Sequence, residues 1–353
     1  MTNRVRRNLI EVMEAEQGEL LAALYDNGAP HAVHLADKLS RCRACREKLR
    51  RWGGRPDLRH VLAAEGGRYR CEHHACWSCR RAKGRGIAKR EAARFCNADN
   101  EHCSHLTIAD SVTRDLSVVR QRVTAMARAL RDRRDAMARA NPSWRGVEIT
   151  GHIELDPYWP DDLESLAPDQ RALIPSLPVI AHVGEGHMWV LRGHLAVRHD
   201  GIARDEVVEA FSRQWQGVNR VHAVAFHDDK LAQENAGHVV AYSIKHLHKH
   251  DVGEMSLRWS VAWQVEYWSW LHEMGRGLQP LRISVGPQQM KNSVPSSAPA
   301  TSLRVRSHRG DDEEPSASCS SVTPVAMQDL DDGDPMPVAI GVWWSPHLGF
   351  RPP

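Results

Sequence analysis

Five of the eight cysteines of this chain lie within 38 residues, and their spacing constrains the fold more than any other feature. Closely spaced thiolates on tight turns converge on one ion with little loss of chain entropy, and four of them complete the tetrahedral shell that Zn²⁺ prefers. The pattern therefore predicts a structural zinc site held by four of the five cysteines, with His73 and His74 as alternative ligands: Cys42, Cys45, Cys71, Cys76 and Cys79.

The same part of the chain is strongly basic. Residues 41–95 contain 17 Lys/Arg against 5 Asp/Glu, a charge of about +12, whereas the formal charge of the whole chain is only +3. A cationic module stapled by a metal is typical of proteins that bind nucleic-acid phosphates. We therefore expect DNA contacts along a cationic helix after the last clustered cysteine, at Arg80, Arg81, Lys83, Arg85, Lys89 and Arg90.

The sequence contains no apolar run of the roughly 18 residues that a membrane span needs. Its first 25 residues are charged throughout and lack the apolar stretch of a secretory signal. We therefore expect a cytoplasmic protein without a membrane partner. In that reducing compartment, clustered cysteines act as metal ligands rather than as disulfides.

Changes in composition divide the chain into four parts. We expect an N-terminal helical segment (1–40), the basic zinc-binding module (41–95), an α+β domain (96–286) and a tail (287–353). The tail holds ten of the 19 prolines together with acidic clusters, so it cannot bury enough apolar surface to fold and is predicted to be disordered. Within the α+β domain, alternation predicts strands at 104–108, 146–155, 188–197 and 221–227, and helical spacing predicts helices at 113–139, 203–216, 236–249 and 258–274.

One short pattern in this domain suits chemistry on a phosphodiester. Tyr242-Ser-Ile-Lys245 would place a phenol and an ammonium on the same face of a helix. A nearby cation favours the phenolate and balances charge that develops on a phosphate, which suits a tyrosine nucleophile. The alternative interpretation is an ordinary amphipathic helix with a surface lysine, because Tyr-x-x-Lys is a frequent pattern.

Acidic and imidazole residues alternate along two of the predicted strands. His152 and Glu154 fall on one face of the first strand, and Arg192 and His194 fall on one face of the second. A glutamate and one or two histidines from adjacent strands would bind Mg²⁺ or Mn²⁺ and polarise a phosphate oxygen. The alternative is a pair of strands whose polar residues simply face solvent.

The order of these segments is informative as a set. The cysteine-rich stretch RYRCEHHACWSCRRAKGRG precedes the strand HLTI, a long helix, a strand ending in Glu154, the strand WVLRGHLAV, the helix with Tyr-x-x-Lys, and EYWSWLHEMGRGL. Over about residues 68–286 this order resembles the plasmid rolling-circle replication initiators of the His-hydrophobe-His (HUH) endonuclease superfamily. The resemblance implies an antiparallel-sheet nuclease domain that nicks one strand of origin DNA and stays joined to its 5′ phosphate.

The resemblance also assigns roles to individual residues. It implies that Tyr242 is the nucleophile, that Lys245 is its electrostatic partner, and that Glu154 and His194 bind the catalytic Mg²⁺ or Mn²⁺. Leu106 and Thr107 would belong to the central strand beneath the site. The implied partners are double-stranded origin DNA, single-stranded DNA, and a host helicase and polymerase.

The chain departs from the family pattern at Arg192-Gly193, which stands where the family has its first histidine and its hydrophobic residue. Arginine has no lone pair with which to bind a cation. Either His152 supplies the missing imidazole from the neighbouring strand, or the site holds metal through fewer protein ligands, or this homologue is catalytically impaired. His187 is a further candidate, near the start of the same strand.

Two other functions fit parts of the pattern. The basic module alone would suit a non-catalytic, zinc-dependent regulator that binds DNA without nicking it. A transposase of the same superfamily would share the fold. A large conjugative relaxase is disfavoured, because the sequence has no G-x-x-x-x-G-K-[ST] loop of the kind that a helicase segment carries.

Overall fold

The computed structural model describes residues 17–42, 71–166, 168–181, 186–217, 219–244, 249–252, 255–275 and 277–286. Cys45, Lys245 and the tail predicted to be disordered lie outside the described residues, as does the side chain of Arg81. All described residues belong to one unit, residues 11–291. None of the helices in these ranges is long and apolar enough to cross a membrane.

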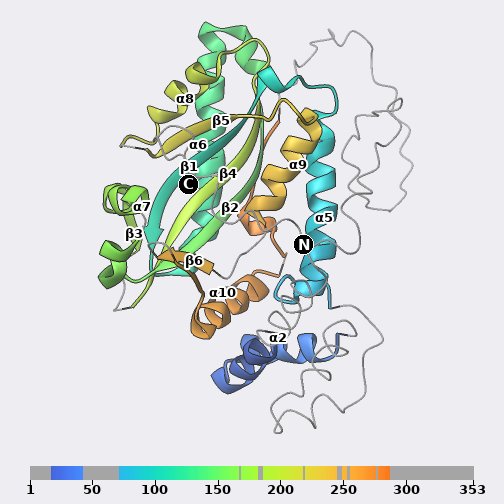
Figure 1. Ribbon diagram of the computed structural model, residues 1–353, viewed down its shortest axis with the longest axis vertical. Coiled ribbons are helices and arrows are strands. Elements are labelled where there is room, and N and C mark those ends of the chain that lie inside the picture. The colour runs from blue at the N-terminus through green and yellow to red at the C-terminus, as the bar shows by residue number, and fades with distance from the viewer. Residues whose placement is uncertain are drawn as a thin grey trace, which may run out of the picture. The chain divides into compact units, whose positions relative to one another are not determined.

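A six-stranded, mostly antiparallel sheet forms the centre of the fold (Figure 1). The predicted α+β class is therefore confirmed. The strands follow the order β3-β1-β4-β2-β8, and β5 pairs with β1 beside β3. Only β3 runs parallel to its neighbour, β1. The strands are β1 (Cys103–Thr113), β2 (Glu148–Tyr158), β3 (Val179–Ala181), β4 (Met188–Arg198), β5 (Val221–Ala225) and β8 (Arg282–Val285).

One face of the sheet is apolar and is covered by the long helix α6 (Val119–Ala140). Helical spacing places Val123, Met126 and Leu130 on the buried side of α6, within the same core cluster as the apolar residues of β1, β2 and β4. The approach is close at Gly193 of β4, where an added Cβ would lie 2.9 Å from the Met126 methyl carbon. The glycine therefore lets α6 sit directly against the strand.

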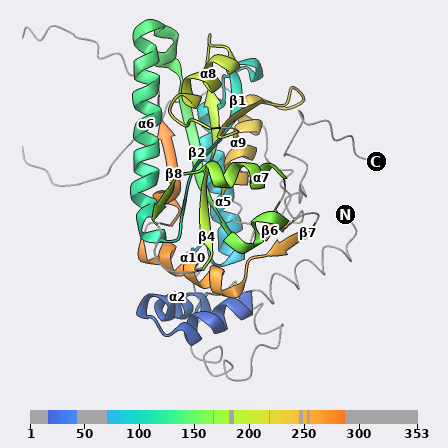
Figure 2. The same ribbon diagram turned by 90° about the vertical axis from the view of Figure 1, so that its left-hand side faces the viewer.

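The other face is covered by α9 (Ala232–Ser243), which packs on β4, β2 and β1, and α5 (Trp77–Ala92) packs beside α9. Figure 2 shows α6 on one side of the sheet and α5 with α9 on the other. This second face carries polar residues, because the alternation along β2 and β4 sends His152, Glu154, Arg192 and His194 toward it.

A buried carboxylate attaches α5 to the sheet. Glu91 is only 1 % exposed and accepts hydrogen bonds from Thr150 of β2 at 2.8 Å and from Arg282 of β8 at 3.2 Å. Burial raises the pKa of Glu91, but the Thr150 hydrogen bond and the charges of Arg282 and Arg94 outweigh it, and the net pKa is lowered. The ionised carboxylate therefore fixes the basic helix against the edge of the sheet.

Helices at the N-terminal end pack on α10 (Val261–Glu273). Residues 17–27 are helical, Gly28 turns the chain with φ +70°, and α2 (Pro30–Ser40) follows. The break falls at Gly28-Ala-Pro30, a sequence typical of a helix end. The N-terminus of α10 is capped by the Ser260 hydroxyl, which accepts from the backbone N–H of Trp263.

Several predicted boundaries were wrong. Residues 157–178 are rich in Pro and Asp, a composition typical of loops, yet they contain short helices that cover one end of the polar sheet face with Leu166, Leu173 and Ile174. The helix expected at 236–249 ends at Ser243. The remaining elements are α7 (Pro168–Leu173), α8 (Arg204–Ser212), β6 (Lys249–Val252), β7 (Met255–Arg258), and the 3₁₀ helices η2 (Ala93–Phe95), η3 (Asn100–His102), η4 (Leu116–Val118), η5 (Pro142–Gly146), η6 (Pro160–Ser165), η7 (Ile174–Ser176) and η8 (Gln279–Leu281).

Candidate functional site

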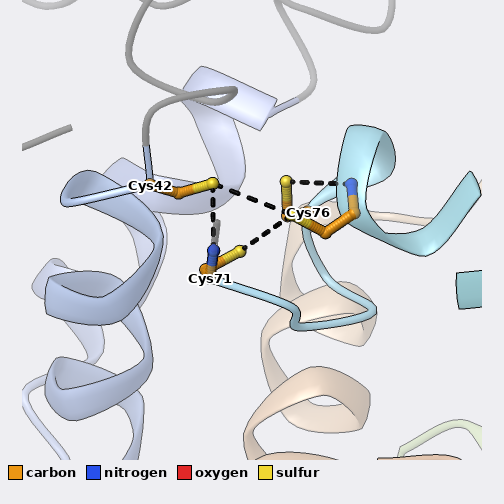
Figure 3. A group of neighbouring side chains, drawn as sticks. Cys42, Cys71 and Cys76 are labelled. Carbon is orange, nitrogen blue, oxygen red and sulfur yellow. Dashed lines mark hydrogen bonds between the residues drawn. The ribbon is translucent and has the colours of Figure 1, made fainter. Parts of the chain in front are cut away.

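Four of the five clustered cysteines meet in a buried group. Cys42 follows α2, Cys71 begins the next described segment, Cys76 caps α5, and Cys79 lies in the first turn of α5. Their four Sγ atoms lie within 4.8 Å of one another. Cys42 Sγ and Cys71 Sγ lie 3.7 and 3.6 Å from Cys79 Sγ. Figure 3 shows Cys42, Cys71 and Cys76 around the common centre.

These distances fit a tetrahedral metal centre. Zinc bound to four sulfurs at about 2.3 Å separates them by about 3.8 Å, whereas a disulfide would need about 2.05 Å. Backbone N–H groups add support, since Cys71 N donates to Cys42 Sγ at 3.2 Å and Cys79 N donates to Cys76 Sγ at 3.4 Å. Such donors stabilise thiolates. The group could therefore hold a metal such as zinc, and it is complete without Cys45.

The two histidines considered as alternative ligands lie beside this group but outside it. His73 Nδ1 accepts from the backbone N–H of Ala75 at 3.0 Å, and its ring packs against Trp268 and His272. Burial lowers the pKa of His73 to about 3 and that of His74 to about 4. Both are therefore neutral at pH 7 and pack as part of the core around the cysteines.

The polar face of the sheet brings together residues from three strands and one helix. His194 of β4 lies at the centre: its Nε2 is 2.8 Å from Glu154 Oε2 of β2, and its Nδ1 is 3.2 Å from His105 Nε2 of β1. Tyr242 of α9 packs edge-on against the His194 ring, with centroids 5.1 Å apart. Thr107 Oγ1 lies 3.5 Å from His105 Nε2. Glu154, His194 and Tyr242 thus converge.

The hydrogen bonds determine which nitrogens carry protons. Burial lowers the pKa of both His105 and His194 to about 3, so each imidazole is neutral at pH 7 and has a single N–H. A carboxylate only accepts, so His194 Nε2 donates to Glu154. His194 Nδ1 must then accept the hydrogen bond from His105 Nε2. The result is a directional chain of hydrogen bonds from β1 through β4 to β2.

His105 was not predicted from the sequence. The available signal was weak: His105 lies two residues before Thr107, so on a strand the two share a face. His152 lies opposite His194 in the strand register, but its charged neighbours are Glu91 and Arg282, beneath α5. Burial lowers the pKa of His152 to about 3. The imidazole in contact with His194 therefore comes from β1 and not from His152.

Arg192 of β4 lies on the same face of the sheet as His194. Its side chain is 6 % exposed and lies 3.3 Å from Asp156 of β2. That pair is next to the pair formed by His194 and Glu154 along the same two strands. His187 is engaged elsewhere, 3.0 Å from Glu266 and in edge contact with Trp189. An ion pair between Arg192 and Asp156 therefore lies beside the pair formed by His194 and Glu154.

The cationic residues predicted to bind DNA on α5 differ in their surroundings. Arg80 lies over the Trp268 ring at 5.5 Å, and Lys83 pairs with Glu72 at 3.5 Å. Arg85 is half-buried, whereas Lys89 is exposed and Arg90 is 65 % exposed. Two of these side chains, Lys89 and Arg90, thus face solvent most fully.

Groups of three or more donors close enough to hold one ion occur twice among the described residues. One is the cysteine quartet, and the other is an exposed set near η3: Asp99, Glu101 and His102. Glu154 and His194 form a pair of donors rather than a triad. No family model, curated protein or solved structure matches this chain.

Proposed function

We propose that this protein initiates rolling-circle replication of a plasmid or phage by nicking one strand of origin DNA through Tyr242. One observation carries the proposal: Glu154, His194 and Tyr242, which are far apart in the sequence, lie together on one face of an antiparallel sheet. Glu154 and His194 could share a face of the sheet by chance, because side chains alternate along strands. That alternation does not explain why a tyrosine from the separate helix α9 packs against His194. A cysteine quartet at the start of the basic helix α5 adds support.

In the proposed reaction, Tyr242 Oη attacks the phosphorus of one phosphodiester. The bond between phosphorus and the 3′ oxygen breaks as the bond to Oη forms. The phenolic proton ends on the 3′ oxygen, so the products are a 5′ phosphotyrosine and a free 3′ hydroxyl. The hydroxyl primes synthesis by a host polymerase. Because the phosphodiester energy is kept in the tyrosyl bond, rejoining needs no nucleotide cofactor.

The pair Glu154 and His194 fits a divalent cation with few protein ligands. Adjacent ligands of an octahedral ion at about 2.1 Å lie about 3.0 Å apart. Glu154 Oε2 and His194 Nε2 are 2.8 Å apart. Mg²⁺ commonly keeps several waters and takes only one or two protein ligands. A bound Mg²⁺ or Mn²⁺ would polarise the phosphate oxygen and stabilise the charge of the transition state.

Arg192 supplies a second positive charge on this face. Its guanidinium cannot bind a cation, but it can donate two parallel hydrogen bonds to phosphate oxygens. Its partner Asp156 holds it against β2 in the absence of substrate. Arg192 would therefore help to position the phosphate where the family uses a second imidazole.

The decisive test replaces the nucleophile. Supercoiled plasmid carrying the cognate origin is incubated with the protein and Mn²⁺, and covalent protein–DNA adducts are separated under denaturing conditions. The wild type should form a 5′-linked adduct, and Tyr242→Phe should form none, because the variant lacks only the attacking oxygen. The matched control is Tyr158→Phe, which removes a hydroxyl bonded to the Met188 sulfur and should leave the adduct intact. An adduct with Tyr242→Phe would refute the mechanism.

A second prediction concerns His105. When His194 Nε2 binds a cation it cannot also carry a proton, so Nδ1 must become the N–H and needs an acceptor; His105 Nε2 is the nearest one. His105→Leu should weaken Mn²⁺ binding by about 10- to 100-fold. His105→Gln places an amide oxygen near the same point and should recover most of it. Electron paramagnetic resonance of free Mn²⁺ measures both.

Thr107→Val is the control for His105, because it removes the hydroxyl 3.5 Å from His105 Nε2 but keeps the His105 imidazole as the acceptor for His194. It should change Mn²⁺ affinity little. Equal affinity of His105→Leu and the wild type would show that His105 does not support the ligand.

The competing function is a zinc-dependent regulator that binds DNA without cutting it. The observation in its favour is the closed cysteine quartet, which serves either protein. If the protein is such a regulator, Tyr242→Phe and His194→Ala should bind DNA with the affinity of the wild type. No covalent adduct should form with either variant or with the wild type.

A further inference from the structure

Helix α6 exposes a row of arginines on the side that faces away from the sheet. Arg120, Arg128, Arg131 and Arg139 are all exposed, whereas Val123, Met126 and Leu130 of the same helix are buried. With 100° per residue, the four arginines fall within an arc of about 100°. With a rise of about 1.5 Å per residue, the row is about 28 Å long.

These four guanidinium groups have no hydrogen bond or ion pair in the part of the chain that the structure describes. The other arginines of α6 are all engaged. Arg122 binds the buried carboxylate of Asp110 through two nitrogens, Arg133 donates to Ala210 O, and Arg134 donates to Gly286 O. The arginines of α6 therefore form two groups. Three of them bind other parts of the fold, and the four that form the outward row (residues 120, 128, 131 and 139) make no such bond.

The outward row contributes unevenly to the stability of the helix. Arg128 and Arg131 are three residues apart, where like charges repel, and Arg120 lies in the first turn, where a cation opposes the helix dipole, whereas Arg139 lies in the last turn, where a cation is favourable. The predicted DNA-binding residues of α5 differ from the row, since Arg80, Lys83 and Arg90 each have an intramolecular partner. Among the described residues, this unpaired row of α6 thus lies across the sheet from Tyr242.

We propose that this outward row of α6 binds the backbone phosphates of duplex DNA. A long helix with a row of exposed arginines matches the regular charge of a stiff duplex, and the length of the row corresponds to about eight base pairs at about 3.4 Å each. The one acidic residue within the same arc, Asp135, is paired with Arg134. Arginine suits the task because its guanidinium forms paired hydrogen bonds with phosphate. The inference rests on the proposed function only in taking DNA as the partner. It assigns a second surface, on the face of the sheet opposite Glu154 and His194.

The test compares two variants of equal charge. The row variant is R120Q/R128Q/R131Q/R139Q. The control is R171Q/R198Q/R204Q/R213Q, four arginines outside α6 that each pair with a nearby carboxylate. Full-length proteins are titrated by fluorescence anisotropy against a duplex of arbitrary sequence, at several salt concentrations. A single strand of the same length is titrated in parallel, and circular dichroism confirms that each variant is folded.

Each phosphate contact contributes about 0.9 to the slope of log K against log salt for B-DNA. In the row variant, the magnitude of the slope for the duplex should fall by about three to four. In the control variant, the slope should differ from the wild-type slope by no more than about 0.9, the value for one phosphate contact. An unchanged slope for the row variant, or a loss confined to the single strand, would overturn the proposal. Tyr242→Phe should keep the wild-type slope, so failure of the nicking reaction and failure of this surface are distinguishable.

Discussion

Removal of metal from the cysteine quartet is expected to lower the stability of the protein around the end of α2 and the start of α5. The four sulfurs are buried and drawn from segments 37 residues apart in sequence (Cys42 to Cys79), so the ion closes a long loop. Structural zinc binding contributes on the order of 10 kcal/mol in small zinc modules, more than a typical domain can spare. A strong chelator should therefore release about one zinc per chain and lower the melting temperature sharply.

Cysteine variants distinguish this prediction from simple oxidation of thiols. Cys79→Ser removes a ligand whose Sγ lies within 3.7 Å of two others and should abolish zinc binding, as measured by elemental analysis. Cys45→Ser and Cys96→Ser should retain zinc, because four sulfurs already complete the shell without them. Full zinc content in Cys79→Ser, or none in Cys45→Ser, would contradict the assignment of ligands.

Acid is expected to unfold the protein well above the pH at which most carboxylates protonate. Burial lowers the pKa of His105, His152 and His194 to about 3, whereas an unfolded histidine titrates near 6.5. Between those values the unfolded state binds protons that the folded state does not. Stability is therefore fully present above pH 6.5 and falls as pH decreases, by up to about 1.4 kcal/mol per pH unit for each imidazole.

Together the three imidazoles contribute up to about 4 kcal/mol per pH unit, so a stability of 5–15 kcal/mol is exhausted within a few units. Acid also protonates cysteine ligands and releases metal, in the same direction. His152→Leu isolates the imidazole effect, because His152 Nδ1 has no hydrogen-bond partner among the described residues. The variant should reduce the pH slope of the unfolding free energy by about 1.4 kcal/mol per unit.

The control for His152→Leu is Ile153→Leu, the next residue on β2. It alters packing without changing the number of titrating groups, so it should shift the midpoint of urea unfolding at every pH and keep the wild-type slope. If His152→Leu also kept that slope, the buried imidazole would not be coupled to acid unfolding.

Local patterns predicted much of this fold. The strands at 104–108, 146–155 and 188–197 and the apolar stripe of α6 are confirmed, because alternation and helical spacing depend on near neighbours. Helix ends were less predictable. The segment 157–178 has prolines and aspartates typical of a loop, yet it folds into short helices because Leu166, Leu173 and Ile174 bury against one end of the sheet. That burial is a tertiary contact and leaves no periodic signal.

The sequence by itself indicated a site made by four of five clustered cysteines and the α+β class, since each depends on residue type and short spacing. Its resemblance to the replication initiators implied Glu154, His194 and Tyr242 as a set, and the structure decided which four cysteines meet. Only the tertiary structure decided which imidazole meets His194. A one-residue change of strand register reverses the face of every side chain. The pairing of Thr107 with His194 puts His105 diagonal to it, whereas His152, directly opposite, is covered by α5. The partners of His194 thus depend on strand register and on helix packing, and local sequence patterns do not specify either of them.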